Sequence, residues 1–238
     1  MTTIAMIPGR IGSTRLPMKN LALLGGRPLL SYAVRAAKAA GVFDRIIVNG
    51  DHEAFRPIAE QEGVEFYLRP KALGSSSTSS DEVVHDFMRA YPADAIAWIN
   101  PTSPLQTGEE IRRVVEHFRA ERLDSLITVE DRYVHAMAGG RPVNFIPEGP
   151  FARTQDLTPV QLFVYSVMMW RTATFMRAFE QSGHALLSGR FGVFPVSKRT
   201  AILIKTPEDL QVVEALLSAA ASEVRYDGRA PKMAGQAR

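Results

Sequence analysis

The sequence predicts an α/β fold of three layers, in which a mostly parallel β-sheet is covered by helices on both faces. Short apolar segments alternate with segments of helical period along most of the chain, which is typical of parallel strands joined by crossover helices. The 238 residues can bury a substantial core, and 46% of them are hydrophobic and 22% charged. We therefore expect a single domain over residues 1–225 and a flexible tail over residues 226–238.

Several predicted elements begin or end at a residue that favours a boundary. Pro28 suits the first turn of a helix that Gly41 ends, and Thr206 suits the N-cap of the last helix. The apolar segment 162–170 fits a strand or a buried helix, and its Val, Phe and Tyr content favours a strand. Helices are predicted at about 28–41, 52–62, 81–91, 107–120, 171–180 and from 206 onward. Strands are predicted at 4–7, 45–48, 64–68, 95–99, 125–129, 162–170, 191–196 and 201–204.

Two features of the sequence indicate where the function lies. In open parallel sheets ligands bind at the carboxyl ends of the strands, so the loops after Ile7, Val48, Leu68, Ile99 and Val129 are expected to share a rim. Residues 132–162 are rich in Gly and Pro and have no clean period. A stretch of this length in a compact domain is usually functional or an interaction arm.

The composition excludes several classes of protein and site. Without cysteine, the chain has no disulfide, thiolate zinc site or cysteine nucleophile. The net charge of +3 and the lack of a basic stripe with aromatics argue against a nucleic-acid partner. The sequence has neither a run of about 18 apolar residues nor a signal peptide at residues 1–8, so we expect a cytoplasmic protein without a membrane partner. The five histidines have no metal-ligand spacing: His52, His85, His117, His135 and His184.

The opening stretch has the composition of a polyphosphate cradle. Gly9, Gly12 and Ser13 permit close approach of the backbone, and basic side chains follow at Arg10, Arg15 and Lys19. Exposed N–H groups and cations are what bind phosphate oxygens, although an ordinary turn with solvated charges gives the same composition. The stretch matches neither the Walker loop nor the dinucleotide fingerprint.

Two further stretches allow a binding or a merely structural interpretation. Residues 75–80 are five serines and one threonine, and they either line a site or form a flexible loop in which Ser80 or Asp81 caps the next helix. Residues 100–105 are either a turn with two prolines or a site at the end of a strand.

Together these stretches resemble the cytidylyltransferases that make CMP-activated acidic sugars, of the acylneuraminate and ketodeoxyoctonate types. The resemblance covers about residues 4–216. The matching positions are Ile7, Pro8, Arg10, Ser13, Leu16, Pro17, Lys19 and Asn20, then Arg69, Pro70, Leu73 and Gly74, then 101–105, and finally 153–160. The departures are Gly9 for Ala, Ser76 for Asp, Asn100 for Gln, Gln106 for Arg, Gln161 for Tyr, and Val164 and Tyr165 for Asn-Gly.

The resemblance implies a nucleotide-diphospho-sugar transferase fold, a homodimer formed through the arm, and transfer of CMP from CTP to an acidic sugar. It also assigns roles. The catalytic residues are Arg10 and Lys19. The nucleotide-binding residues are Pro8, Gly9, Gly12, Ser13, Arg15, Asn20, Arg69, Ser75 and Ser80. The sugar-binding residues are Asn100, Thr102, Ser103, Gln155 and Asp156.

One departure affects the expected cofactor. The family typically has two alternating Asp residues before the last helix, and the resemblance implies that they hold Mg²⁺. Leu203 and Lys205 occupy these positions, so the usual ligands are absent, and Lys205 would place a positive charge beside the triphosphate. Two alternatives therefore stay open: a nucleotide- or sugar-binding protein with lost or altered metal-dependent activity, and a nucleotidyltransferase that uses another NTP or sugar.

Overall fold

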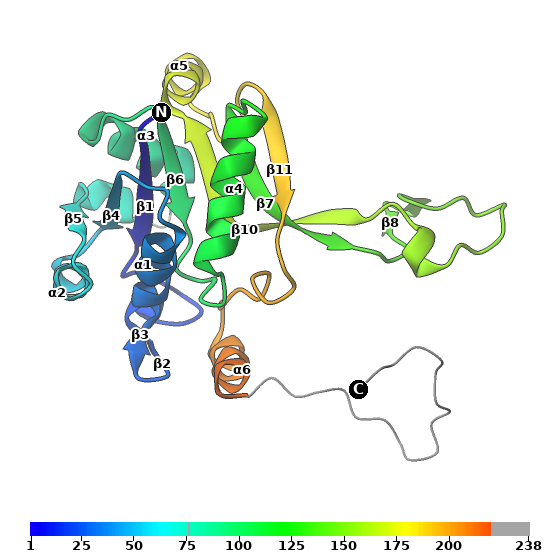
Figure 1. Cartoon of the computed structure of the whole chain (residues 1–238), viewed down its shortest axis with the longest axis horizontal. Helices are drawn as coiled ribbons and strands as arrows, with labels where there is room; N and C mark the ends of the chain where they lie inside the picture. Colours follow the sequence, from blue (N-terminus) through cyan, green and yellow to red (C-terminus); the bar gives the residue numbers. More distant parts are fainter. Residues whose placement is uncertain (76, 220–238) are drawn as a thin grey trace.

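The computed structural model describes residues 1–75 and 77–219. In this part of the chain a seven-stranded sheet has the strand order β11-β7-β10-β6-β1-β4-β5 (Figure 1). Neighbouring strands are parallel except where β10 pairs with β6 and β7, so the prediction of a mostly parallel sheet is confirmed. The strands are β1 (Thr3–Gly9), β4 (Arg45–Gly50), β5 (Glu65–Leu68), β6 (Ala95–Ile99), β7 (Ser125–Arg132), β10 (Val160–Arg171) and β11 (Phe191–Pro195).

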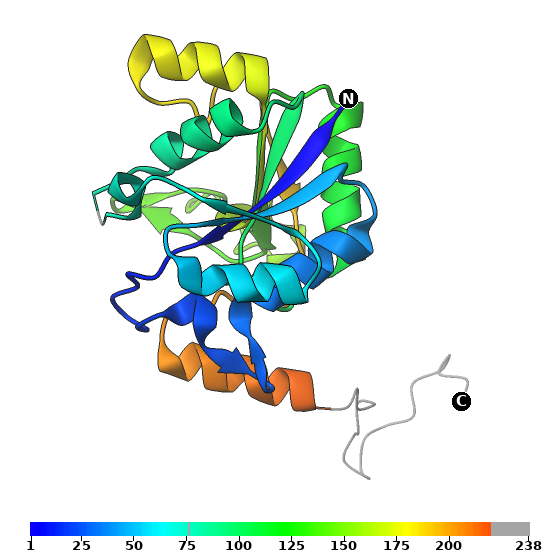
Figure 2. The same cartoon turned by 90° about the vertical axis from the view of Figure 1, so that its left-hand side faces the viewer.

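Helices cover both faces of this sheet, which confirms the three layers (Figure 2). One face packs against α1 (Leu29–Ala40), α2 (Arg56–Gln61) and α4 (Gly108–Ala120), and the other against α3 (Ser80–Ala90) and α5 (Thr172–Ser182). Successive residues of β1 alternate between these two cores, with Ile7 in the first and Met6 in the second, as the strand period requires. No described helix is long and apolar enough to cross a bilayer.

The last helix, α6 (Pro207–Ser218), lies apart from the sheet. It packs with the hairpin of β2 (Leu23–Leu24) and β3 (Arg27–Pro28) through a small apolar cluster that contains Leu24, Ile204 and Val213. Its start is the predicted one: Thr206 accepts a hydrogen bond from the Asp209 N–H, and the Asp209 carboxylate accepts one from the Thr206 N–H. The hairpin and α6 thus fix the segment that enters the helix.

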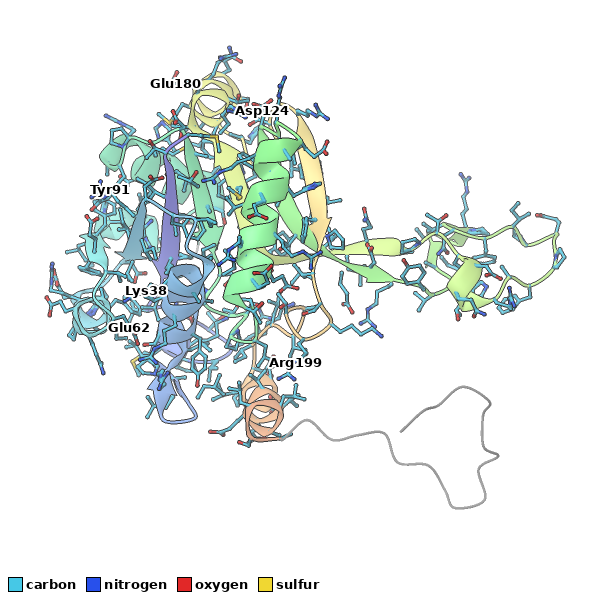
Figure 3. The ribbon with its side chains drawn as sticks, viewed as in Figure 1. Lys38, Glu62, Tyr91, Asp124, Glu180 and Arg199 are labelled. Carbon is cyan, nitrogen blue, oxygen red and sulfur yellow. The ribbon has the colours of Figure 1, made fainter. Side chains whose placement is uncertain are left out.

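Polar contacts fix the helices on the first face to one another. The Lys38 ammonium donates to the Glu62 carbonyl oxygen at 2.7 Å, and Arg35 pairs with the Glu62 carboxylate at 2.9 Å, which joins α1 to the end of α2 (Figure 3). On the other face, a polar contact fixes α5 to the residue before β7. The Asp124 carboxylate accepts a hydrogen bond from the Thr174 hydroxyl at 2.9 Å.

Three local predictions are wrong. Residues 201–204 form a loop rather than a strand. The Ile204 N–H donates to the carbonyl oxygen of Thr102, which also lies in a loop. The predicted helix over 52–62 is a 3₁₀ turn, Glu53–Phe55, followed by the short α2. The N-cap of α3 is Ser79 rather than Ser80 or Asp81, because Ser79 and Glu82 form a reciprocal capping box.

The segment between β7 and β10, rich in Gly and Pro, projects from the body as an arm (Figure 1). It contains the two-residue strands β8 (Met137–Ala138) and β9 (Arg141–Pro142) and a 3₁₀ turn at Thr154–Asp156. Asn144 holds it together, since its side chain bonds the Ala136 N–H and the carbonyl oxygens of Val134 and Thr158. The tail predicted over 226–238 lies outside the described residues.

The contact between α1 and α4 yields a test of the packing. A Cβ at Gly108 would lie 2.6 Å from the Ala39 carbonyl carbon, so Gly108→Ala must separate the two helices. We expect it to lower the free energy of unfolding by roughly 1–3 kcal/mol in urea denaturation. Gly149→Ala is the control, because its nearest neighbour would be the Ile146 carbonyl oxygen at 3.8 Å. Equal stability of the two variants would contradict the packing.

Candidate functional site

A cleft of about 480 Å³ opens at the carboxyl ends of β1, β5 and β6. Three of the stretches singled out in the sequence line it: the opening loop, the loop after β5 and the loop after β6. Parallel strands bring their carboxyl ends to one edge of a sheet, which is why stretches about 90 residues apart in the chain meet there. The predicted site residues that line the cleft are Pro8, Arg10, Gly12, Ser13, Arg15, Lys19, Asn20, Arg69, Ser75, Ser80, Asn100 and Thr102.

A buried ion pair fixes two of these loops to the sheet. The Asp51 carboxylate accepts a hydrogen bond from the Ile11 N–H at 2.9 Å and lies 3.5 Å from the Arg69 guanidinium. The side chains of Asp51 and Arg69 are 2% and 3% exposed, so solvent screens this attraction little. Arg69 also donates to the carbonyl oxygens of Asn49 at 2.6 Å and Leu73 at 3.4 Å. Arg69 therefore positions the loops of the cleft, and most of its donors already have partners.

Lys19 lines the cleft, and Asp209 is the acidic group that acts on its ammonium. It follows Met18, whose φ of 50° places a non-glycine residue in the left-handed region. Burial lowers the pKa of Lys19 below its ordinary value, the nearby Arg15 and Lys205 charges lower it further, and Asp209 opposes them. A bound anion would relieve this repulsion, so the electrostatics favour an anionic ligand at this point.

Three residues that line the cleft each have a polar side-chain atom that is buried without a hydrogen-bond partner among the described residues. The atoms are Arg10 Nε, Asn20 Oδ1 and Trp98 Nε1. Such atoms are costly when unpaired, so these three side chains are candidates to change contacts when a ligand binds. The sequence interpretation missed Trp98, because a tryptophan inside an apolar strand is typical of a core residue.

The hydroxyl-rich loop after β5 reaches the cleft through Ser75, Thr78, Ser79 and Ser80. Ser79 is engaged in the helix cap, and Thr78 Oγ1 donates to the Ala72 carbonyl oxygen at 3.1 Å. The run therefore supplies the cap of α3 and also lines the cleft, and the binding interpretation stays a prediction.

The predicted sugar residues separate into two groups. Asn100 and Thr102 line the cleft, and Asn100 is oriented by a hydrogen bond to the Tyr165 carbonyl oxygen at 3.1 Å. Ser103 is instead fully buried and donates to the Thr200 carbonyl oxygen at 2.7 Å. Gln155 and Asp156 lie in the 3₁₀ turn of the arm and do not line this cleft.

At two positions that depart from the family pattern, Gly9 and Tyr165, the structure shows what the substitution does locally. Gly9 does not line the cleft, and a Cβ there would lie 3.0 Å from the Phe55 ring, so the usual Ala would be crowded. Tyr165 replaces a Gly and has a φ of 60°, in the left-handed region, where the strand β10 shifts register between Phe163 and Met168. A residue with a side chain bears the strain there that glycine avoids.

The residues at the expected metal positions do not fit a protein-bound Mg²⁺. Leu203 packs against the apolar core of the first sheet face, and Lys205 extends into the cleft as a cation. Among the described residues, the charged side chains that line the cleft are Arg10, Arg15, Lys19, Arg69 and Lys205, and no carboxylate accompanies them. Mg²⁺ requires oxygen ligands, typically with at least one carboxylate.

The ion pair yields a prediction about loop order and stability. Asp51→Asn keeps an acceptor for the Ile11 N–H but leaves the buried Arg69 charge unpaired, so we expect the free energy of unfolding to fall by about 3 kcal/mol or more. The control is Glu53→Gln, which breaks the exposed pair with Arg56 and should leave the free energy of unfolding close to that of wild type. Chemical denaturation measures both, and similar losses would contradict the role given to the buried pair.

Comparisons with known proteins agree with this geometry. The N-acylneuraminate cytidylyltransferase of Streptococcus agalactiae serotype V is 25% identical over 218 residues, 88% of this chain and 52% of that protein. The 3-deoxy-manno-octulosonate cytidylyltransferase of Bdellovibrio bacteriovorus is 35% identical over 118 residues, 50% of this chain and 46% of that protein. The chain thus spans about half the length of the curated relatives it matches.

The fold is also that of a solved structure, CMP:2-keto-3-deoxy-manno-octonic acid synthetase complexed with CTP. The TM-score is 0.69 at 14% identity, over 92% of this chain and 99% of that one. A family model described as Cytidylyltransferase matches residues 4–139. Because this match covers more than half of the 238 residues, the chain belongs to the cytidylyltransferase family.

Proposed function

We propose that the chain transfers CMP from CTP to an acidic sugar of the nonulosonic or ketodeoxyoctonic type and releases pyrophosphate. The observation that carries this proposal is the cleft itself, where the opening loop, the hydroxyl-rich loop and the loop of Asn100 and Thr102 meet. Membership of the cytidylyltransferase family and the names of the relatives support CTP and an acidic sugar as substrates.

The chemistry needs positioning and charge rather than a covalent intermediate. The anomeric hydroxyl of the sugar attacks the α-phosphorus, the bond from that phosphorus to the bridging oxygen of the β-phosphate breaks, and the hydroxyl proton passes to solvent. Negative charge grows on the departing pyrophosphate, and fixed cations stabilise it. We assign this work to Arg10 and Lys19, with Ser13, Arg15 and Asn20 in support.

The remaining roles follow from which residues line the cleft. Ser75 and Ser80 are assigned to the nucleoside, whereas Arg69 acts through the loops that it holds, since its guanidinium is buried against Asp51 and Asn49. Asn100 and Thr102 are assigned to the sugar. Because Ser103 is buried and its hydroxyl donates to the Thr200 carbonyl oxygen, we assign it no contact with the substrate.

We also propose that the protein is a homodimer joined through the arm. Ile146 and Phe151 on the arm are 75% and 82% exposed, and apolar side chains this exposed favour an interface. Gln155 and Asp156 lie on the same arm, away from the cleft of their own chain, and would approach a sugar only in a second copy.

Lys19→Ala tests the transfer reaction. Since removal of one preorganised cation or donor costs about 100-fold or more in rate, we expect kcat/KM for pyrophosphate release from CTP and acidic sugars to fall by about that factor. Lys71→Ala is the matched control, because Lys71 lies in the 3₁₀ turn after β5, is exposed and does not line the cleft. An unchanged rate in Lys19→Ala would refute the assignment.

Because Leu203 and Lys205 replace the Asp pair of the family, two other functions are alternatives. A protein that binds CTP but never releases pyrophosphate with any acidic sugar would be a nucleotide-binding protein of this fold. Thermal shifts with the four NTPs identify a different nucleotide preference, since fold alone does not set the substrate.

Ile146→Asp tests the dimer. A charge at this exposed position cannot be buried at an interface without a large cost, so we expect sedimentation velocity to show a shift from dimer to monomer. Val212→Asp, at an exposed apolar position on α6, should leave the dimer intact. A wild-type monomer, or a dimer that both variants retain, would contradict the proposed interface.

A further inference from the structure

We propose that the cleft binds polyphosphate as a metal-free anion, with the Lys205 ammonium in the place that a divalent cation would otherwise take. The inference rests on the proposed function, in that the polyphosphate is the triphosphate of the nucleotide. Its basis is the set of charges that the described part of the chain presents to the cleft, which are the three arginines and two lysines given above.

Hydrogen bonds hold the backbone around Lys205 at the edge of the cleft. The preceding residue, Ile204, is fully buried among Leu24, Leu105 and Val213, and its N–H donates to the Thr102 carbonyl oxygen at 2.8 Å. The Lys205 N–H donates to the Asp209 carboxylate at 2.8 Å. Lys205 is thus held between the loop after β6 and the first turn of α6.

The carboxylates near the cleft are already engaged in structural contacts. Asp209 accepts hydrogen bonds from the N–H groups of Lys205 and Thr206 at the start of α6. Asp51 accepts from the Ile11 N–H and pairs with Arg69. Recruiting either one as a metal ligand would therefore break a helix cap or the buried pair that holds the opening loop.

The cations are close enough to repel one another. Burial and the charges of Arg15 and Lys205 lower the pKa of Lys19, and Asp209 opposes them. A divalent cation held by the protein would add to this repulsion, whereas a polyphosphate would remove it. The charges therefore select the free anion over its magnesium complex, which carries less negative charge.

Isothermal titration calorimetry with inorganic tripolyphosphate and with CTP, in EDTA and in excess Mg²⁺, tests the inference. We expect wild type to bind tripolyphosphate in EDTA and Mg²⁺ to leave the affinity unchanged or to weaken it. Lys205→Gln should weaken binding in EDTA by about tenfold, the value of one charge-assisted contact. Lys198→Gln is the control, an exposed lysine of a nearby turn that does not line the cleft, and it should bind as wild type does.

Lys205→Asp is the second variant and restores a carboxylate at the same position. We expect its binding to become dependent on Mg²⁺, and thermal unfolding without ligand verifies that it folds. The inference is overturned if wild type binds tripolyphosphate only with Mg²⁺, if Mg²⁺ tightens wild-type binding tenfold or more, or if wild type binds in neither buffer.

The two proposals fail in different ways. Pyrophosphate release from CTP by a wild type that binds the nucleotide only with Mg²⁺ would overturn the metal-free site and leave the transferase function standing. Tripolyphosphate binding in EDTA without any preference for CTP would contradict the function and leave the metal-free anion site standing.

Discussion

The buried pair of Asp51 and Arg69 is the contact on which the geometry of the cleft depends. Asp51 follows β4, Arg69 follows β5, and the Asp51 carboxylate reaches across to the Ile11 N–H in the loop after β1. The turn after Arg69 also packs closely here, since a Cβ on Gly74 would lie 2.9 Å from an Asp51 oxygen. One ionic contact thus ties the opening loop, the hydroxyl-rich loop and the sheet together.

The sequence predicted the sheet, its two helical layers and the meeting of the three loops, because these follow from strand period, helix boundaries and the geometry of parallel strands. It did not predict that β10 runs antiparallel, since an apolar strand pattern carries no direction. It also assigned Ser103 to the sugar although the Thr200 carbonyl takes its hydroxyl, and it passed over Trp98. Such contacts depend on tertiary partners that residue spacing does not specify.

The charge distribution separates this cleft from a site built around a metal. Leu203 belongs to the apolar core and Lys205 to the cleft, so neither family position offers an oxygen ligand. In the proposed reaction, cations already in the cleft would stabilise the charge that grows on the departing pyrophosphate. The repulsion around Lys19 in the ligand-free cleft is the cost of that arrangement.

A crystal structure of the protein with a non-hydrolysable CTP analogue and Mn²⁺, measured at the manganese absorption edge, tests the central claim most directly. The account predicts the triphosphate against Lys19 and Lys205, with no anomalous peak on the bound triphosphate. A manganese ion on the triphosphate or ligated by a carboxylate of the protein, or a triphosphate bound outside the cleft, would contradict it.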